Sequence, residues 1–280
     1  MARTTSARGS ARPNLLGGTM GWLWLALTIV PIYYIVVTSV RPRSEYYSAN
    51  PLSLPGSPTL EAYERVLAAD FTRYFLNSLV VTAVTVAVVV LVSLMASYVV
   101  VRNRSAGSRR LFEAFLLGIA IPIQGVIVPV YYLIVQLGLY DTLWALVLPS
   151  IAFAVPITVL ILTNFVRDVP GELFESMRLD GATDWAMLWR LVAPLAKPAL
   201  ITVAIYDALQ VWNGFLFPLI LTQSAEVRVL PLSLWTFQGA FSVDIPAVLA
   251  AVVLSVLPLL AVYTVGRRFL VSGLSAGFTK

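Results

Sequence analysis

Few residues of this chain could do chemistry, and the commonest catalytic ones are absent. Its 280 residues include no histidine and no cysteine, which removes the usual general base, thiolate metal sites and disulfides. Residues 273–277 fit the G-x-S-x-G pattern of a nucleophilic serine, but that pattern needs a strand–turn–helix setting and a histidine partner. We therefore expect no catalytic residue and no metal site, and a membrane enzyme is disfavoured.

Nucleotide binding by this chain is not expected either. A phosphate-binding G-x-x-x-x-G-K-[ST] loop needs a lysine preceded by glycine. The lysines are Lys197 and Lys280, and neither follows a glycine. If the chain takes part in an ATP-driven process, another polypeptide must bind the ATP.

One acidic residue, Asp207, lies inside an apolar segment that has no basic residue to pair with it. Such residues are costly in a bilayer and generally face the interior of a helix bundle or water. At about 100° per residue, one side of a helix here carries hydrogen-bonding groups and an aromatic ring: Asp207, Gln210, Asn213, Gly214 and Phe217. This side could bind the hydroxyls and C–H face of a sugar, or it could be a polar helix–helix contact without a ligand. Gln124 and Thr158 are weaker candidates for the same pathway.

The composition is that of a polytopic membrane protein. Hydrophobic residues make up 59% of the chain, charged residues 12%, and the mean hydropathy is +0.86. A soluble domain carries about 25% charged residues. The net charge of +5 comes from basic residues beside apolar segments rather than on one face, so it is better explained by orientation in a bilayer than by nucleic-acid binding.

Six continuous apolar segments are long enough to cross a bilayer. They are not β-barrel strands, because apolar and polar residues do not alternate along them. They are residues 20–40, 75–101, 114–139, 143–166, 199–221 and 245–266. Residues 1–19 read as a polar tail before an uncleaved first span. With that tail in the cytoplasm, 14 of the 19 basic residues fall on the inner side. The bias predicts a multi-pass protein of the cell membrane with both termini cytoplasmic.

Residues 172–192 are predicted to form two short helices, which we call the paired helices. Good helix formers fill residues 172–179, and Gly181 can adopt the left-handed conformation that ends a helix. Thr183 is a suitable N-cap for the second helix, with Asp184 near its positive end. Along that helix, one side is expected to carry Trp185, Leu188, Trp189 and Val192. Two helices joined rigidly beside a membrane suit a protein partner.

The paired helices resemble the EAA signature of permease subunits in ATP-driven importers. Glu175, Gly181, Leu191 and Pro194 stand at the spacing of that signature, while Ser176, Met177 and Ala193 depart from its usual alanines and leucine. Residues 180–182 (Asp-Gly-Ala) and 189–190 (Trp-Arg) resemble the carbohydrate-uptake branch. The resemblance continues through residues 74–79, Trp212-Asn213 with Gly214 in place of an aspartate, 230–231, 237–239 and 268–277.

This resemblance implies an all-α membrane protein with six transmembrane helices, the MetI-like permease fold, in which residues 20–280 form the permease domain. It implies that the EAA region couples the chain to an ATPase through Glu175, Ser176, Met177, Asp180, Gly181, Ala182, Trp185 and Pro194. The implied partners are a second permease, an ATPase dimer that binds ATP and Mg, and an extracellular solute-binding protein. The implied cargo is a sugar, either an oligosaccharide or a polyol.

The sequence also allows other cargoes and another class of transporter. A glycerol phosphate is the second choice of cargo, although an anion would prefer basic groups, which the spans lack. A secondary transporter would want inverted repeats and intramembrane ion sites, and no such repeat is evident. Residues 222–244 carry Trp235, Phe237 and Phe241, which suit partner docking and interfacial anchoring equally well.

Overall fold

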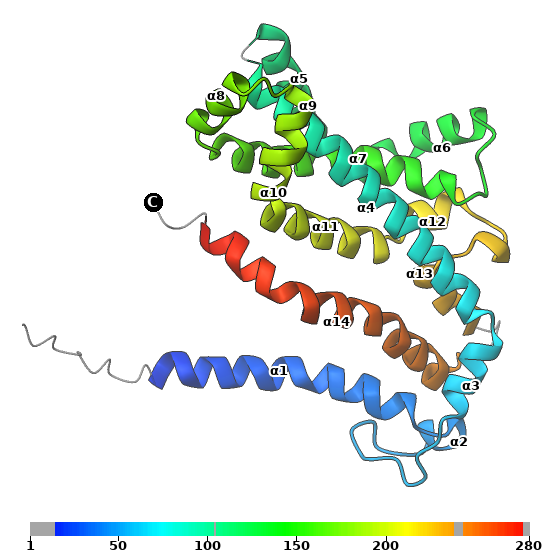
Figure 1. Ribbon diagram of the computed structural model, residues 1–280. Coiled ribbons are helices and arrows are strands. Elements are labelled where there is room, and N and C mark those ends of the chain that lie inside the picture. Colours follow the sequence, from blue (N-terminus) through cyan, green and yellow to red (C-terminus); the bar gives the residue numbers. More distant parts are fainter. Residues whose placement is uncertain (1–14, 104, 238–242, 277–280) are drawn as a thin grey trace, which may run out of the picture.

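The chain folds into α-helices that pack side by side (Figure 1). The computed structural model describes residues 15–103, 105–237 and 243–276. Four helices in this part are long and apolar enough to cross a membrane. They are α1 (Leu15–Ser39), α4 (Phe71–Arg102), α7 (Trp144–Arg167) and α14 (Ile245–Ala276). Two further spans are obtained if each of two bent helix pairs counts as one. The predicted all-α, six-span class is thus confirmed.

The third predicted span, residues 114–139, is not one helix. It is divided into α5 (Ala106–Ile119), a 3-10 turn η1 (Ile123–Val126) and α6 (Ile127–Gln136), with a bend of 95°. Pro122 explains the break, because it lacks an N–H and disfavours helical backbone at the residue before it. The helix also starts earlier than predicted, since the side chain of Ser105 caps it by accepting a hydrogen bond from Ser108 N.

The fifth predicted span, residues 199–221, is likewise interrupted. Helix α11 (Lys197–Trp212) ends, and α12 (Leu216–Leu221) follows after three residues. The break contains Gly214, where a Cβ would lie 3.0 Å from the carbonyl oxygen of Val211. Since the prediction assumed one helix, Asp207 and Phe217 were placed on a common helix face, whereas they lie on two different helices.

Shorter helices connect and extend the long ones. On the side of the molecule away from the paired helices lie α2 (Arg43–Tyr46), α3 (Glu61–Ala68), η3 (Ala225–Val227), α13 (Leu230–Ser233) and η4 (Leu234–Phe237). The paired helices are α8 (Gly171–Leu179) and a second, composite helix. The latter consists of α9 (Asp184–Met187), a π-helical turn η2 (Leu188–Val192) and α10 (Ala193–Leu195). It meets α11 at 76°.

The centre of the bundle is the pair α4 and α7, which contact each other more extensively than any other two helices described. Helix α14 packs against both α11 and α1, so α1 lies at the edge of the bundle (Figure 1). Most side chains of α1 are apolar and exposed, as expected of a helix that faces lipid.

Several predictions concern the chain ends and one loop. Helix α14 continues to Ala276, so residues 273–276 are helical and the strand–turn–helix setting of a nucleophilic serine is absent from them. Gly277, residues 1–14 of the predicted tail, and Gly239 and Phe241 of the predicted loop lie outside the described residues.

Candidate partner surface and pathway cavity

The turn between the paired helices has the predicted left-handed glycine. Gly181 has φ +78°, and the N–H groups of Gly181 and Ala182 donate to the carbonyls of Arg178 (3.1 Å) and Met177 (2.9 Å). These bonds satisfy carbonyls that the end of α8 would otherwise leave unpaired. The predicted N-cap is also present, because Thr183 Oγ1 accepts from Ala186 N at 3.2 Å. The turn is therefore fixed by backbone bonds to α8 on one side of the glycine and by the Thr183 side-chain cap on the other.

The paired helices are anchored by buried side chains. Phe174 of α8 is 2% exposed and packs in one cluster with Met187, Leu188 and Val192 of the second helix and with residues of α4 and α7. The prediction of one shared side for Trp185, Leu188, Trp189 and Val192 is wrong, since both tryptophans are exposed. Trp185 and Leu188 lie about 60° apart around a helix, and the buried stripe centres on the side of Met187 and Leu188.

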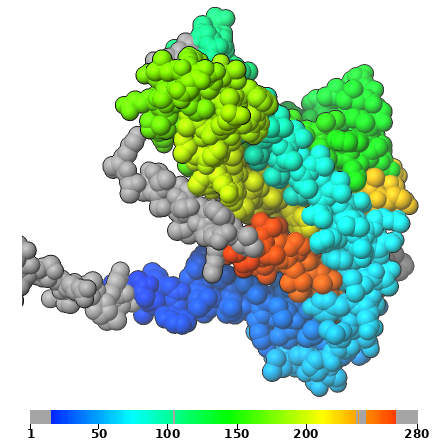
Figure 2. All heavy atoms as spheres, in the orientation of Figure 1, coloured from blue at the N-terminus to red at the C-terminus, as the bar shows by residue number. Residues whose placement is uncertain are grey.

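The remaining surface of the paired helices projects from the bundle as a lobe (Figure 2). Trp185 and Trp189 stack edge to face on it, with ring centroids 5.5 Å apart, and Leu179 is 89% exposed. Among the residues predicted to couple to an ATPase, Met177 and Ala182 are partly buried, and the others are exposed: Glu175, Ser176, Asp180, Gly181, Trp185 and Pro194. Six of the eight predicted residues are thus exposed on the paired helices.

Helix α4 contacts both paired helices through residues that the sequence prediction missed. Tyr98 Oη donates to Asp184 Oδ1 at 2.9 Å, and Arg178 Nη2 donates to the same oxygen at 3.3 Å. The guanidinium of Arg102 lies 4.1 Å from the ring centroid of Phe174, a favourable cation–π geometry. No sequence signal pairs α4 with residues more than 70 positions away, so only the tertiary structure reveals these contacts.

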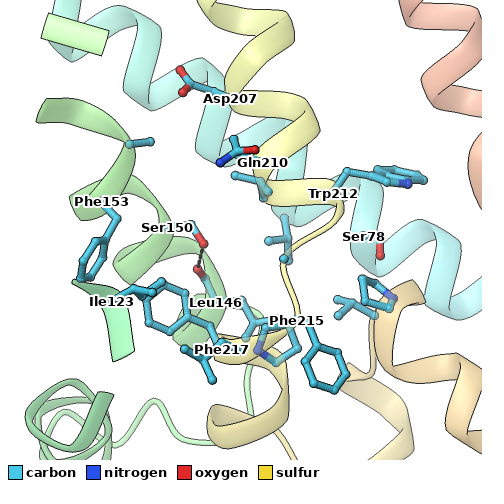
Figure 3. Close-up of a pocket in the computed structure, with 18 of the residues that line it drawn as sticks. Ser78, Ile123, Leu146, Ser150, Phe153, Asp207, Gln210, Trp212, Phe215 and Phe217 are labelled. Carbon is cyan, nitrogen blue, oxygen red and sulfur yellow. Dashed lines mark hydrogen bonds between the residues drawn. The ribbon is translucent and has the colours of Figure 1, made fainter. Parts of the chain in front are cut away.

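A cavity of about 250 Å³ lies between α4, α7, α11 and α12. Figure 3 shows Asp207 and Gln210 projecting from α11, with Ser150 and Phe153 of α7 opposite and the rings of Phe215 and Phe217 at the other end. Three predicted pathway residues, Asp207, Gln210 and Phe217, line this cavity. The sequence prediction missed Ser150 and Phe153, because nothing in the apolar run of α7 indicates which face of the helix borders a cavity.

Asp207 is 1% exposed, and its Oδ2 accepts a hydrogen bond from Thr158 Oγ1 of α7 at 2.9 Å. No lysine or arginine among the described residues forms an ion pair with it. It is also the one charged residue in the lining of this cavity. Asp207 therefore makes the polar helix–helix contact and also lines a cavity, while the binding of a sugar there stays a prediction.

Two predicted pathway residues lie elsewhere. Asn213 is exposed, and its Nδ2 donates to Leu209 O at 2.8 Å. It lines a second cavity of about 440 Å³ that lies against α14 and also contains Phe215 and Trp235. Asn213 directly follows α11 and is not in the lining of the first cavity. Gln124 is exposed within η1, while its neighbour Ile123 lines the first cavity.

Comparison with known proteins agrees with this arrangement. The family described as "binding-protein-dependent transport system inner membrane component" matches residues 89–275, about two-thirds of the chain. A putative ABC transporter permease protein of Caldicellulosiruptor sp. is 36% identical over 258 residues, covering 92% of this chain and 94% of the relative. A diacetylchitobiose uptake system permease protein of Streptomyces coelicolor is 33% identical over 258 residues, covering 91% and 85%.

A solved structure has the same fold. A chain of a bacterial ABC transporter involved in the import of the acidic polysaccharide alginate superimposes with a TM-score of 0.79 at 22% identity, over 93% of this chain and 98% of that one. This chain belongs to the family of binding-protein-dependent transport system inner membrane components.

Proposed function

We propose that this chain is one permease subunit of an ATP-driven importer that takes up a neutral oligosaccharide or polyol delivered by an extracellular binding protein. Relatives with assigned cargo support a saccharide. They include the diacetylchitobiose permease and a trehalose transport system permease of Mycobacterium tuberculosis, 28% identical over 96% of this chain. A structural neighbour is a transporter in complex with a pentasaccharide-bound periplasmic protein.

The observation that carries the proposal is the projecting lobe of the paired helices. An exposed, apolar and aromatic surface on a rigid base is typical of a protein interface. Here it combines Glu175 with Trp185 and Leu179, and its base is fixed by Phe174. We assign this lobe to the ATPase contact, with ATP and Mg bound by that partner and none by this chain. The lobe and both termini then lie in the cytoplasm, and α3 and η3 lie outside.

The first cavity favours a neutral cargo over a glycerol phosphate. Its lining carries Asp207 as the one charged group and no lysine or arginine, so an anion entering it would meet a like charge of low solvation. Its volume of about 250 Å³ is below the range of about 300–1,000 Å³ usual for ligand pockets. A second permease facing it would complete the pathway, in agreement with the proposed heteromeric importer.

The test uses the importer assembled with its ATPase and binding protein in proteoliposomes. Glu175→Ala should leave the permease folded but lower ATPase association, and with it binding-protein-stimulated ATP hydrolysis, by about 30-fold or more, as expected for a buried interfacial charge. Glu172→Ala is the matched control, since Glu172 is also exposed and lies on the same helix outside the predicted contact. Equal ATPase association by both variants would exclude the assigned contact.

The cargo class is tested by uptake of neutral disaccharides, polyols and a glycerol phosphate through the same proteoliposomes. ATP-dependent accumulation of a neutral saccharide supports the proposal. Accumulation of glycerol phosphate alone would refute the neutral cargo, and uptake that follows a proton gradient without ATP would make the chain a secondary transporter.

A further inference from the structure

Helix α4 differs from the other long helices in its sequence. Among the four described helices that can each span a membrane, α1, α7 and α14 all contain proline, whereas residues 71–102 contain neither proline nor glycine. Proline and glycine are the usual causes of helix kinks. With 32 residues, α4 is about 48 Å long, longer than the roughly 30 Å hydrocarbon core. Of these four helices, α4 is the one without a proline or glycine that would favour bending, so it is suited to carry a displacement across the membrane.

One end of α4 is attached to both paired helices. Its contact with the second helix is the hydrogen bond from Tyr98 to Asp184 (2.9 Å), and Arg178 of α8 joins the same carboxylate oxygen. Its contact with α8 is Phe174, whose ring packs near Tyr98 and under Arg102. A movement of either helix relative to the bundle therefore acts on the last turns of α4.

The opposite end of α4 is attached to the η3 loop, residues 222–229, and to the start of α13. Asn77 Nδ2 donates to the carbonyls of Glu226 (2.8 Å) and Arg228 (2.9 Å). Ser78 Oγ accepts from Leu230 N at 2.8 Å in a buried position. Val229 and Pro231, on either side of this bond, line the first cavity. A shift of α4 along its axis or sideways would thus move one wall of the cavity.

We infer that α4 is a strut, a stiff helix that transmits movement of the paired helices to the η3 loop and so to one wall of the cavity. Tyr98 and Asp184 make the contact at one end, and Asn77 makes it at the other. This inference rests on the proposed function, because the movement it transmits is the one imposed by the ATPase. Figure 1 shows the path, with the paired helices beside one end of α4 and α3 and α13 beside the other. Between them, Ser97 Oγ donates to Val159 O of α7 at 3.2 Å.

The ends of the strut are tested by transport per ATP hydrolysed in the assembled importer. Tyr98→Phe removes the hydroxyl that bonds Asp184, and Asn77→Ala removes the bonds to the η3 loop. Each should lower transport per ATP by about fivefold or more, the scale of a site–site coupling energy. Because the two ends act in series, the double variant should be no worse than the stronger single one. Tyr74→Phe is the control, since Tyr74 is a buried tyrosine of α4 that takes part in none of the contacts above.

The stiffness of the strut is tested on the purified permease alone. Since the chain has no cysteine, Leu179→Cys and Glu226→Cys can carry the only two spin labels, and electron paramagnetic resonance gives their distance distribution. Ala83→Gly with Ala87→Gly softens α4 at exposed positions that make none of the contacts above. This pair should broaden the distribution. The same two changes at exposed positions of α1 and α14, Ala26→Gly with Ala261→Gly, should not.

The outcomes separate the two proposals. If wild-type importer shows no ATP-dependent uptake, the proposed function fails, while the distance measurement still decides whether α4 is a stiff connection. If wild type transports normally but Tyr98→Phe and Asn77→Ala match Tyr74→Phe, the strut is refuted and the proposed function stands. Equal label distributions in both glycine pairs would refute it as well.

Discussion

The paired helices and the cavity region are organised in opposite ways. In the paired helices, Phe174, Met187 and Val192 are almost fully buried, and the turn at Gly181 is closed by backbone hydrogen bonds to α8 and by the Thr183 cap. Around the cavity, α11 stops at Trp212 and α12 begins three residues later, and one side-chain hydrogen bond, Thr158 to Asp207, crosses from α7 to α11. The first region is complete in one chain. The second is left open, as expected for half of a pathway.

The largest expected effect contrasts two buried phenylalanines. Phe174→Ala should lower the free energy of unfolding by about 3–5 kcal/mol, because it removes a ring from a closed core. Phe217→Ala should cost clearly less, because its ring already borders a cavity and its removal only enlarges that space. Thermal unfolding of the two variants in detergent measures both. Equal losses would show that the cavity region is packed as tightly as the paired helices.

The second effect concerns the turn. Gly181→Leu should destabilise the protein by about 1–3 kcal/mol, because a leucine is strained at φ +78°. Space is not the reason, since nothing lies within 4 Å of a Cβ built at this position. Gly171→Leu is the control, because Gly171 is equally open but has no positive φ. A similar loss of unfolding temperature in both variants would contradict the backbone explanation.

A smaller effect is expected in the cavity wall. Thr158→Val leaves the buried carboxylate of Asp207 without its hydrogen bond and should cost about 1 kcal/mol. Thr163→Val is a control on the same helix, since the buried Thr163 hydroxyl has no hydrogen-bond partner in the described structure and its loss should be neutral or stabilising. A double-mutant cycle with Asp207→Asn measures the coupling directly. If Thr158 and Asp207 showed no coupling, the one side-chain hydrogen bond found here between α7 and α11 would make no contribution to stability.

The smallest expected effect is on the stability of the protein at acidic pH. Asp141, in the loop before α7, accepts hydrogen bonds from the backbone N–H groups of Gln223 (2.8 Å) and Ser224 (3.0 Å). Burial raises the pKa of this carboxyl, but the hydrogen bonds outweigh it and hold the pKa below its ordinary value of 3.8. Its contribution to stability is therefore full above about pH 4 and is lost as the pH falls through the lowered pKa.

Asp141→Asn tests this contribution, since asparagine tolerates the left-handed backbone that Asp141 adopts, with φ 58°. The unfolding temperature of the wild type should fall more steeply below pH 4 than that of the variant, and the two should run parallel above it. If the unfolding temperatures of both proteins fell equally steeply below pH 4, the charge of Asp141 would not contribute to stability.

The sequence predicted the paired helices well and the cavity poorly, for a physical reason. Gly181 and Thr183 act through local backbone geometry, which neighbouring residues specify. Asn213 was placed beside Asp207, and Phe217 on the same helix as Asp207, because a continuous apolar run gives no signal for where α11 ends. Gly214 and Pro122 were visible in the sequence, but prolines and glycines are tolerated in membrane helices, so they did not predict breaks by themselves.

By itself, the sequence determined that the chain is an all-helical membrane protein, that it has a polar helix pair with the EAA spacing, and that Asp207 is an unpaired acid within a span. These properties follow from composition, local propensity and the cost of charge in lipid. Only the tertiary structure decided that Asp207 meets Thr158, that Tyr98 meets Asp184, and that α4 joins the paired helices to the η3 loop. Those contacts join residues 49 to 151 positions apart, and packing of whole helices, which no local pattern encodes, brings them together.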